Sequence, residues 1–299
     1  MFSYVTYNDL VNDIRENLHK IPSDVYGVIA RSRSGMLPAT IISEHLNVGL
    51  VDFCTFEEKM SQKLPIDVIF GSHGKRGIRK PNTKKFLFVD DTVSSGSTMQ
   101  TADEFFEKHI KENEYEFIKL CVYLEGDCHI SKPDIYLKDL REFASTSYLK
   151  EVLYEWNIFG RNWINKYTLF DLDGVVCIDP PDELRGDEYI EYINNPIPLH
   201  IPIQYGDVVI NIMTYRLEKY RNQTERFLQK HFSNFNLMMF PSESYTERSK
   251  IPPYIYKGEY YKNHDDFILF VESDDWQAAL INEISGKPVF CVGSNKMYN

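Results

Sequence analysis

Residues 86–99 read FLFVDDTVSSGSTM. Four apolar residues lead into two adjacent acids, Asp90 and Asp91, and a run of Thr, Ser and Gly follows. The apolar run predicts a fully buried strand, and residues 98–111 predict a helix. Ligands of parallel α/β sheets bind where strands end, so the two carboxylates and the hydroxyl-rich loop mark a candidate binding site.

Strands and helices alternate on both sides of this stretch. Apolar runs at 26–30 and 117–125 predict buried strands, and helical spacing predicts helices at 7–19 and 37–45. We therefore predict an α/β protein of two domains, 1–165 and 166–299, each a mainly parallel sheet with flanking helices. In the second domain we expect strands at 166–174, 207–216, 265–275 and 288–292, helices at 217–232 and 276–284, and a loop-like segment at 180–207.

The composition restricts the partners of this chain. Its 299 residues carry a net charge of −11, which argues against nucleic acid and against an anionic membrane surface. The five cysteines lack CxxC spacing and predict reduced thiols rather than a disulfide frame or a zinc site. The polar N-terminal stretch does not read as a signal peptide, and no apolar run approaches the roughly 20 residues of a membrane span. We expect a cytoplasmic protein without an integral membrane segment.

The stretch FLFVDDTVSSGST resembles the phosphoribosyl diphosphate signature of the type I phosphoribosyltransferases. The resemblance implies that Asp90 and Asp91 accept hydrogen bonds from the two ribose hydroxyls. It also implies that the loop and the N-terminus of the following helix bind the 5-phosphate, with Gly96 letting the backbone come close to the ligand. The residues expected in this loop are Thr92, Ser94, Ser95, Gly96, Ser97 and Thr98.

Two further segments match this family, and the resemblance covers about residues 20 to 160. Residues 30–35, ARSRSG, follow the first long strand, where the family places a loop for the diphosphate and its magnesium. Residues 71–80, GSHGKRGIRK, match a basic flap that closes over the diphosphate. The alternative for both segments is a solvated basic turn. The candidate contacts are Arg31, Arg33, Ser34 and Gly35 in the first segment, and Lys75, Arg76, Arg79 and Lys80 in the second.

The implied reaction is displacement of diphosphate from C1 of the ribose, with magnesium and the cations stabilising the leaving group. Residues 134–148, where the family binds the acceptor, carry no recognisable specificity motif. The acceptor, the anomeric outcome and the general base for the transfer are therefore left open.

A second acidic strand end, YTLFDLDG at 167–174, resembles motif one of the haloacid dehalogenase-like (HAD) phosphatases. The resemblance implies that Asp171 attacks phosphorus, and that Asp173 protonates the leaving alcohol and later activates water. Gly174 would permit the sharp turn. The alternative for a lone DxDG is a calcium loop.

The remaining HAD motifs have counterparts in the right order. Thr214 is the candidate for motif two, and Lys257, with Lys262 as the reserve, for motif three. In motif four Ser273 follows Glu272, which departs from the common adjacent acid pair and leaves the second acid as Asp274 or Asp275. About forty residues separate Asp173 from Thr214, which predicts a minimal cap and an open site. The magnesium ligands implied are Asp171, Asp173, Glu272 and Asp274.

Together the two resemblances imply a bifunctional magnesium-dependent enzyme. One domain would transfer 5-phosphoribosyl from phosphoribosyl diphosphate to an acceptor, and the other would remove the 5-phosphate. We favour a glycan hydroxyl as the acceptor, with ribofuranose incorporated into a bacterial polysaccharide. The alternatives are a nucleobase acceptor, of the orotate or purine type, in nucleotide salvage, or a phosphoribosyl diphosphate sensor that controls the phosphatase. A homodimer is left open.

Overall fold

The computed structural model describes residues 2–70, 83–143, 151–181 and 186–299. The chain forms two compact units: Val5–Trp156, and the N-terminal residues through Tyr4 together with Asn157–Asn299. We call them the first and the second unit. Both are α/β with mainly parallel sheets, which confirms the predicted fold class.

The division between the units comes earlier in the sequence than the boundary expected after residue 165. The segment 157–165 packs within the second unit, where Ile158 and Ile164 are buried. The side-chain amide of Asn165 donates hydrogen bonds to the carbonyls of Phe159 at 3.0 Å and Ile203 at 2.9 Å. The sequence pattern gave no sign of these contacts, because the segment lacks a regular apolar period.

The sheet of the first unit is parallel throughout, in the order β3-β2-β4-β5-β6. Its central strand β4 carries the two acids, and β2 lies directly beside it. The bounds are β2 Gly27–Ala30, β3 Gly49–Asp52, β4 Lys85–Val93, β5 Glu116–Leu124 and β6 Ile135–Asp139.

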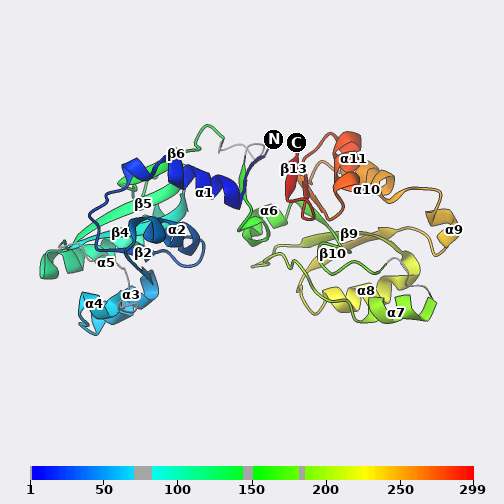
Figure 1. Cartoon of the computed structure of the whole chain (residues 1–299). Helices are drawn as coiled ribbons and strands as arrows, with labels where there is room; N and C mark the ends of the chain where they lie inside the picture. The colour runs from blue at the N-terminus through cyan, green and yellow to red at the C-terminus, as the bar shows by residue number, and fades with distance from the viewer. Residues whose placement is uncertain (1, 71–82, 144–150, 182–185) are drawn as a thin grey trace. The chain divides into compact units, whose positions relative to one another are not determined.

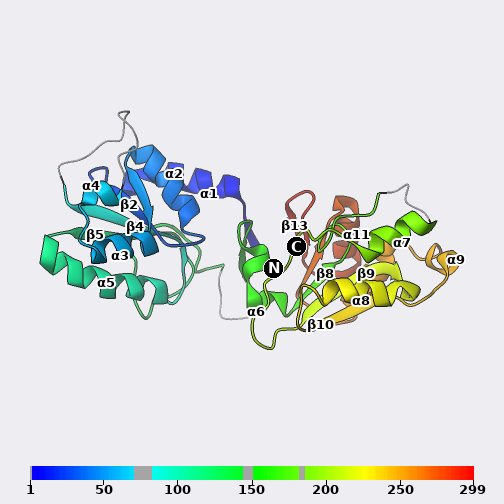
Figure 2. The ribbon, with the colours of Figure 1, turned by 90° about the horizontal axis from the view of Figure 1, so that it is seen from below.

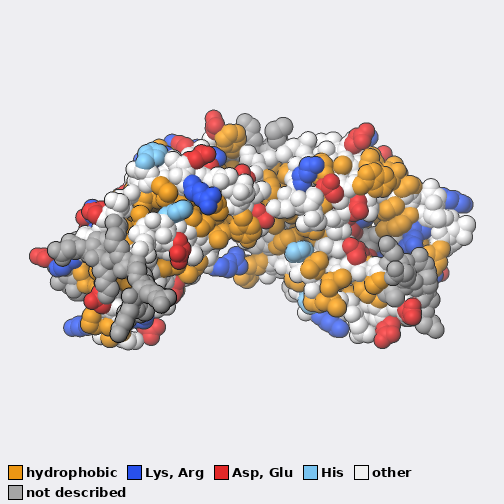
Figure 3. All heavy atoms as spheres, viewed as in Figure 1, with side chains coloured by type: hydrophobic (Ala, Val, Ile, Leu, Met, Phe, Trp, Pro, Cys, Tyr) orange, Lys and Arg blue, Asp and Glu red, His pale blue; other side chains and the backbone are white. Residues whose placement is uncertain are grey.

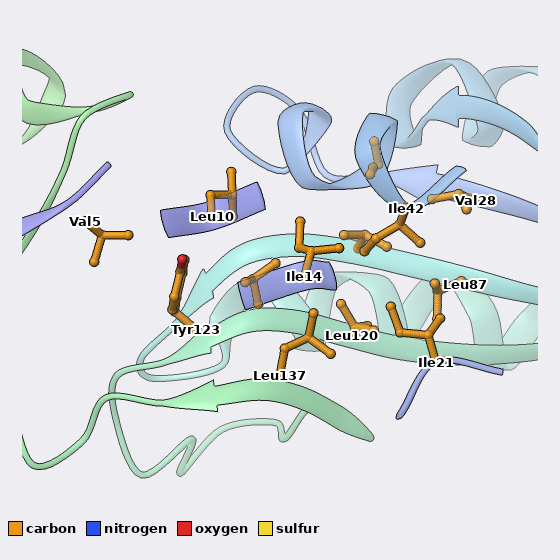
Figure 4. Packing of buried hydrophobic residues seen from close by; sticks show 14 of the residues in the cluster. Val5, Leu10, Ile14, Ile21, Val28, Ile42, Leu87, Leu120, Tyr123 and Leu137 are labelled. Carbon is orange, nitrogen blue, oxygen red and sulfur yellow. The ribbon is translucent and has the colours of Figure 1, made fainter. Parts of the chain in front are cut away.

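Helices cover both faces of this sheet, with α1 and α2 on one face and α3 and α5 on the other (Figure 2). Successive residues of β4 point to opposite faces: Leu87 packs beneath α1 and α2 (Figure 4), whereas Phe86 and Phe88 pack against α3 and α5. The bounds are α1 Tyr7–Glu16, α2 Met36–Leu46, α3 Phe53–Ser61, α4 Ile66–Ile69 and α5 Ser97–Asn113.

Helix α1 begins at a capping box in which Thr6 and Asp9 satisfy each other's backbone N–H groups. The helix ends at Glu16, short of the expected residue 19, and a 3₁₀ turn, Leu18–Lys20, continues the chain.

The sheet of the second unit has the order β10-β9-β8-β11-β12-β13, and only β13 runs antiparallel to its neighbour. A separate two-stranded sheet joins β1 and β7. The bounds are β1 Ser3–Val5, β7 Val152–Tyr154, β8 Thr168–Asp171, β9 Ile210–Leu217, β10 Phe235–Phe240, β11 Leu269–Glu272, β12 Val289–Cys291 and β13 Lys296–Tyr298.

Helices α10 and α11 lie on one face of the second sheet, and α7 and α8 on the other (Figure 1). The helix expected at 217–232 is shorter, because β9 runs on to Leu217 and a 3₁₀ turn, Glu218–Tyr220, precedes α8. The expected loop at 180–207 contains α7, whose Ile193 is buried. The bounds are α6 Asn162–Asn165, α7 Gly186–Asn194, α8 Arg221–Leu228, α9 Tyr245–Arg248, α10 Pro253–Lys262 and α11 Asp275–Ser285.

Charged side chains of both signs are interspersed over the face shown in Figure 3 rather than gathered by sign. Among the described residues, no helix has the length and apolar character needed to cross a membrane.

Candidate active sites

The first candidate site forms where β2 and β4 run side by side. Ala30 pairs with Val89, and the amide of Arg31 donates to the Val89 carbonyl at 2.8 Å. This register brings the loop after β2 next to Asp90 and Asp91. The two segments that the sequence analysis assigned to one ligand are therefore adjacent in the structure.

Asp91 is almost completely buried, and both of its oxygens accept hydrogen bonds. The Ser34 hydroxyl donates to Oδ1 at 2.8 Å, and the Trp156 indole donates to Oδ2 at 2.7 Å. Ser34 was a sequence candidate, but Trp156 was missed, because it lies 65 residues further along the chain. A ligand hydroxyl that reaches Asp91 must share or replace these two donors.

Asp90 lies beside Asp91 and is also buried. Burial, reinforced by the negative charge of Asp91, raises the pKa of Asp90 well above its ordinary value. The sequence predicts that the two acids lie at the end of their strand. Strand β4 instead continues to Val93, so the acids lie inside it. Pairing with β5 holds this extension, since Thr92 and Val93 lie opposite Tyr123 and Leu124.

A three-residue turn, Ser94–Gly96, connects β4 to the N-terminus of α5. Gly96 has a φ of +87°, and a Cβ at this position would lie 1.8 Å from the Ser131 carbonyl oxygen. Amides of the opposite loop hold the turn, since Cys128 and Ile130 donate to the carbonyls of Ser94 and Ser95, each at 3.0 Å. The turn thus has one tightly fitted backbone path, which leads into a helix N-terminus able to bind an anion.

The other candidates of the first site fall into three groups. Thr92, Ser95 and Thr98 are half-buried, and Ser94 and Ser97 are exposed. Gly35 is the N-cap of α2, where a Cβ would lie 2.6 Å from the Arg31 carbonyl oxygen; Arg31 is half-buried and Arg33 is exposed. The flap candidates Lys75, Arg76, Arg79 and Lys80 lie outside the described residues.

The second candidate site lies where β8 and β11, adjacent parallel strands, both end in an acid. Lys257 of α10 lies between Asp171 and Glu272: its Nζ is 2.8 Å from Asp171 Oδ2 and 2.7 Å from Glu272 Oε2. All three side chains are buried. The structure brings Lys257 to the acids, whereas Lys262, at the end of the same helix, is exposed.

Two carboxylates share this single ammonium group. Burial and the charge of Glu272 raise the pKa of Asp171 well above its ordinary value, even though Lys257 opposes the shift. Burial disfavours the charge on Lys257, but the two acids outweigh burial and raise its pKa. With both acids ionised the three side chains carry a net charge of −1, which a bound cation would neutralise.

Asp173 forms a bidentate ion pair with Arg216 of β9. The Asp173 Oδ1 atom lies 2.5 Å from Arg216 Nη2, and Oδ2 lies 3.0 Å from Nε. Arg216 is 2% exposed, and although burial disfavours its charge, Asp173 more than compensates and raises its pKa. Arg216 was not among the residues predicted from the sequence, where its one signal is an arginine at the end of the apolar run VVINIMTYR.

Thr214 directly follows Met213, the residue of β9 that pairs with Asp171 of β8. Its side chain is fully buried, and its hydroxyl oxygen accepts a hydrogen bond from the Arg216 amide at 3.2 Å. It does not line the cavity described below. Asp274 does line the cavity and caps α11, whereas Asp275 bonds to Tyr298 at 2.7 Å, away from the cavity lining.

A cavity of about 1240 Å³ opens over these acids. Its charged floor contains Asp171, Asp173, Glu272 and Asp274, and also Asp179, which the sequence analysis did not single out. Burial, reinforced by the charges of Asp173 and Glu272, raises the pKa of Asp179 to about 6.

Gly174 provides the sharp turn that the sequence predicts after Asp173. Its φ is +79°, and a Cβ would lie 2.2 Å from the Ser273 hydroxyl and 2.5 Å from Asp179 Oδ2. Only glycine fits this backbone path, which aligns the acids of the floor.

Magnesium has a suitable donor set here, although the side chains alone do not enclose a metal ion. Within the described residues no three His, Cys, Asp or Glu side chains cluster closely enough to do so. Asp171 and Glu272 nevertheless supply hard oxygen donors that together outweigh the charge of Lys257. Asp173 adds its backbone carbonyl, near the Ser273 hydroxyl at 3.5 Å. The chemistry of these residues therefore fits magnesium.

No known family model matches this chain, but two curated relatives share sequence similarity with it. Xanthine-guanine phosphoribosyltransferases of Chromohalobacter salexigens and Idiomarina loihiensis are 31% identical over 103 residues and 32% identical over 101 residues. The matches span 33% and 32% of this chain, and 59% and 60% of those relatives. The chain therefore spans less than two thirds of the length of either one. Both support the phosphoribosyltransferase part of the resemblance.

Two solved structures show lower similarity. A purine phosphoribosyltransferase from Pyrococcus horikoshii is 17% identical with a TM-score of 0.32, covering 52% of this chain and 93% of that one. The Helicobacter pylori xanthine-guanine-hypoxanthine phosphoribosyltransferase is 16% identical with a TM-score of 0.35, covering 53% and 95%.

Proposed function

We propose that the first unit transfers a 5-phosphoribosyl group from phosphoribosyl diphosphate to an acceptor. The observation that carries this proposal is the register of β2 with β4, which puts the loop containing Arg31 and Ser34 beside Asp90 and Asp91. The names of the two curated relatives agree with it.

We infer a task for each part of this site. The turn Ser94–Gly96 and the first amides of α5 bind the 5-phosphate, and the acids of β4 orient the ribose through its hydroxyls. Arg31 and Arg33 stabilise charge as diphosphate departs from C1. Magnesium would arrive with the diphosphate and add to this stabilisation.

We propose further that the second unit hydrolyses a phosphate monoester. The contact of Lys257 with both Asp171 and Glu272 supports this, since it fixes the attacking carboxylate and places a cation beside it. Magnesium, held by Asp171, Glu272 and the Asp173 carbonyl, would neutralise phosphate charge as a Lewis acid. Asp173 would protonate the leaving alcohol and later take a proton from the hydrolytic water, and the two N–H donors of Arg216 hold its carboxylate in place.

The two proposed activities connect through the 5-phosphate, which the first would introduce and the second remove. The net result is transfer of an unphosphorylated ribofuranosyl group, and we favour a glycan hydroxyl as acceptor. A nucleobase acceptor is the second candidate, because both curated relatives are named for purine substrates.

The acceptor is tested by incubating the protein with phosphoribosyl diphosphate and either sugars or xanthine, guanine and orotate, and measuring diphosphate and phosphate. Release of diphosphate with sugars, followed by phosphate, supports the glycan acceptor. Release with nucleobases alone contradicts it and supports the second candidate.

Matched variants separate the two sites. Asp171→Asn is expected to abolish phosphate release and leave diphosphate release intact. Asp90→Asn combined with Asp91→Asn is expected to do the reverse: it abolishes diphosphate release and leaves intact the release of phosphate from a phosphate monoester that is added directly. If the protein binds phosphoribosyl diphosphate and changes its phosphatase rate, yet releases no diphosphate with any acceptor, the first unit is a sensor.

A further inference from the structure

The cavity of the second unit is larger than a ribose 5-phosphate requires. Pockets that bury drug-sized ligands measure roughly 300–1,000 Å³, and this one reaches about 1240 Å³. Besides the five acids, its lining includes Tyr215, Tyr220, Tyr245, Lys219 and Arg248. The cavity is therefore large enough for a second group of the substrate besides the phosphate ester, and its lining has polar and charged side chains that could bind it.

Four cations line this cavity, and they differ in their partners. Arg216 and Lys257 are held by acids of the floor. For Lys219 and Arg248, by contrast, no carboxylate lies within ion-pair distance in the described part of the chain. The protein has a net charge of −11, and five acids line the same cavity. Two cations that have no carboxylate partner in these surroundings can bind an anion from solution.

Tyrosine rings lie against both cations, and the Lys219 side chain is exposed. Lys219 Nζ lies 4.2 Å from the centroid of the Tyr245 ring and 5.1 Å from that of Tyr220. Arg248 Cζ lies 5.0 Å from the centroids of both Tyr245 and Tyr215, and its Nη1 donates to the Tyr215 carbonyl at 3.3 Å. The Tyr245 ring thus contacts both cations, which restricts their motion and leaves N–H groups available for a bound anion.

We propose that Lys219, Arg248 and Tyr245 form a subsite for a second anionic group, a carboxylate or a phosphate, on the ester that the second unit hydrolyses. The inference rests on the proposed phosphatase function and specifies its substrate class. Such a substrate places its monoester over Asp171 and its second anion at this subsite, where charge-assisted hydrogen bonds from guanidinium and ammonium bind it.

Pairs of substrates that differ by one anionic group test the subsite. Uridine 5′-monophosphate against orotidine 5′-monophosphate tests a carboxylate, and adenosine 5′-monophosphate against adenosine 3′,5′-bisphosphate tests a phosphate. The full chain is expected to prefer the doubly anionic member of at least one pair by about tenfold or more in kcat/KM. In Lys219→Met and in Arg248→Met this ratio is expected to fall toward one.

Lys250→Met is the matched control, since it removes an exposed cation of the same segment that does not line the cavity. Its ratio is expected to stay at the wild-type value. The subsite is overturned if Lys219→Met and Arg248→Met lower kcat/KM equally for both members of each pair. It is also overturned if the wild type shows no preference in either pair. Preservation of the ratio in Lys219→Met and Arg248→Met overturns it as well.

Calorimetric titration of the same nucleotides separates failure of the subsite from failure of the proposed function. If neither the wild type nor any variant releases phosphate, the phosphatase proposal fails. The subsite then stands if the doubly anionic nucleotide binds about tenfold more tightly and Lys219→Met removes that difference. It falls if both nucleotides of each pair bind equally.

Discussion

Asp90 and Asp91 are neighbouring acids that the first unit buries together, although a folded chain is more stable without such a pair. The pKa of Asp90 is raised by burial and by the charge of Asp91, so its carboxylate is the less stable form in the folded state. The pair is retained at the site where ribose hydroxyls are proposed to bind, which suggests a stability cost accepted for function.

We therefore predict that Asp90→Asn stabilises the protein. A carboxyl whose pKa is raised on folding binds more protons when folded, so stability falls as pH rises above the unfolded value of about 4 toward the raised folded one. The variant is expected to have the higher Tm at pH 7, and its Tm is expected to fall less than that of the wild type as the pH rises above about 4. An identical pH dependence in both proteins would contradict the burial argument. Asp134→Asn, at an exposed acid, is the control.

Arg216 holds Asp173 in the second site, and its removal leaves that acid without its bidentate partner. We predict that Arg216→Met lowers the free energy of unfolding by about 3 kcal/mol, as for other disrupted buried ion pairs. Denaturant titration measures the loss. The double variant Arg216→Met with Asp173→Asn is expected to recover part of the stability, because no unpaired charge remains. A single variant within about 0.5 kcal/mol of wild type would show that the pair is not important for folding.

At the scale of elements, the turn between β4 and α5 depends on Gly96. Both its φ of +87° and the Ser131 carbonyl exclude a side chain. We predict that Gly96→Ala displaces the turn, lowering affinity for phosphoribosyl diphosphate by about tenfold or more and stability by about 1–3 kcal/mol. Gly206→Ala, at φ +61° with open space around it, controls for backbone strain alone and is expected to leave the affinity unchanged.

The sequence predicts elements well where their apolar pattern is regular. The helices near residues 37–45 and 276–284 appear within one residue of their predicted bounds, and the buried strand that leads into Asp90 is present but continues to Val93. Prediction is poorer for α7 and for the split of 217–232, where tyrosines and polar residues obscure the period. Trp156, Arg216 and Asp179 were missed because their roles depend on contacts between distant segments, which no local pattern records.

At the scale of the whole molecule, each unit has its own sheet and its own buried core. Leu10 belongs to a core of the first unit and Ile281 to one of the second, and both are fully buried. We predict two unfolding transitions in calorimetry. Leu10→Ala and Ile281→Ala are each expected to lower the free energy of unfolding of their own unit by about 2–5 kcal/mol. Leu10→Ala should therefore shift only the transition of the first unit, and Ile281→Ala only that of the second. A single transition that both variants shift equally would show cooperative unfolding of the units.

The hydrogen bond from Trp156 to Asp91 makes the first site directly observable by spectroscopy. Of the three tryptophans, Trp163 and Trp276 belong to the second unit, whereas Trp156 donates directly to an acid of β4. A ribose hydroxyl that takes over Asp91 alters the surroundings of that indole, and its fluorescence emission changes with ligand concentration. Binding can thus be titrated without a label, before any acceptor is known.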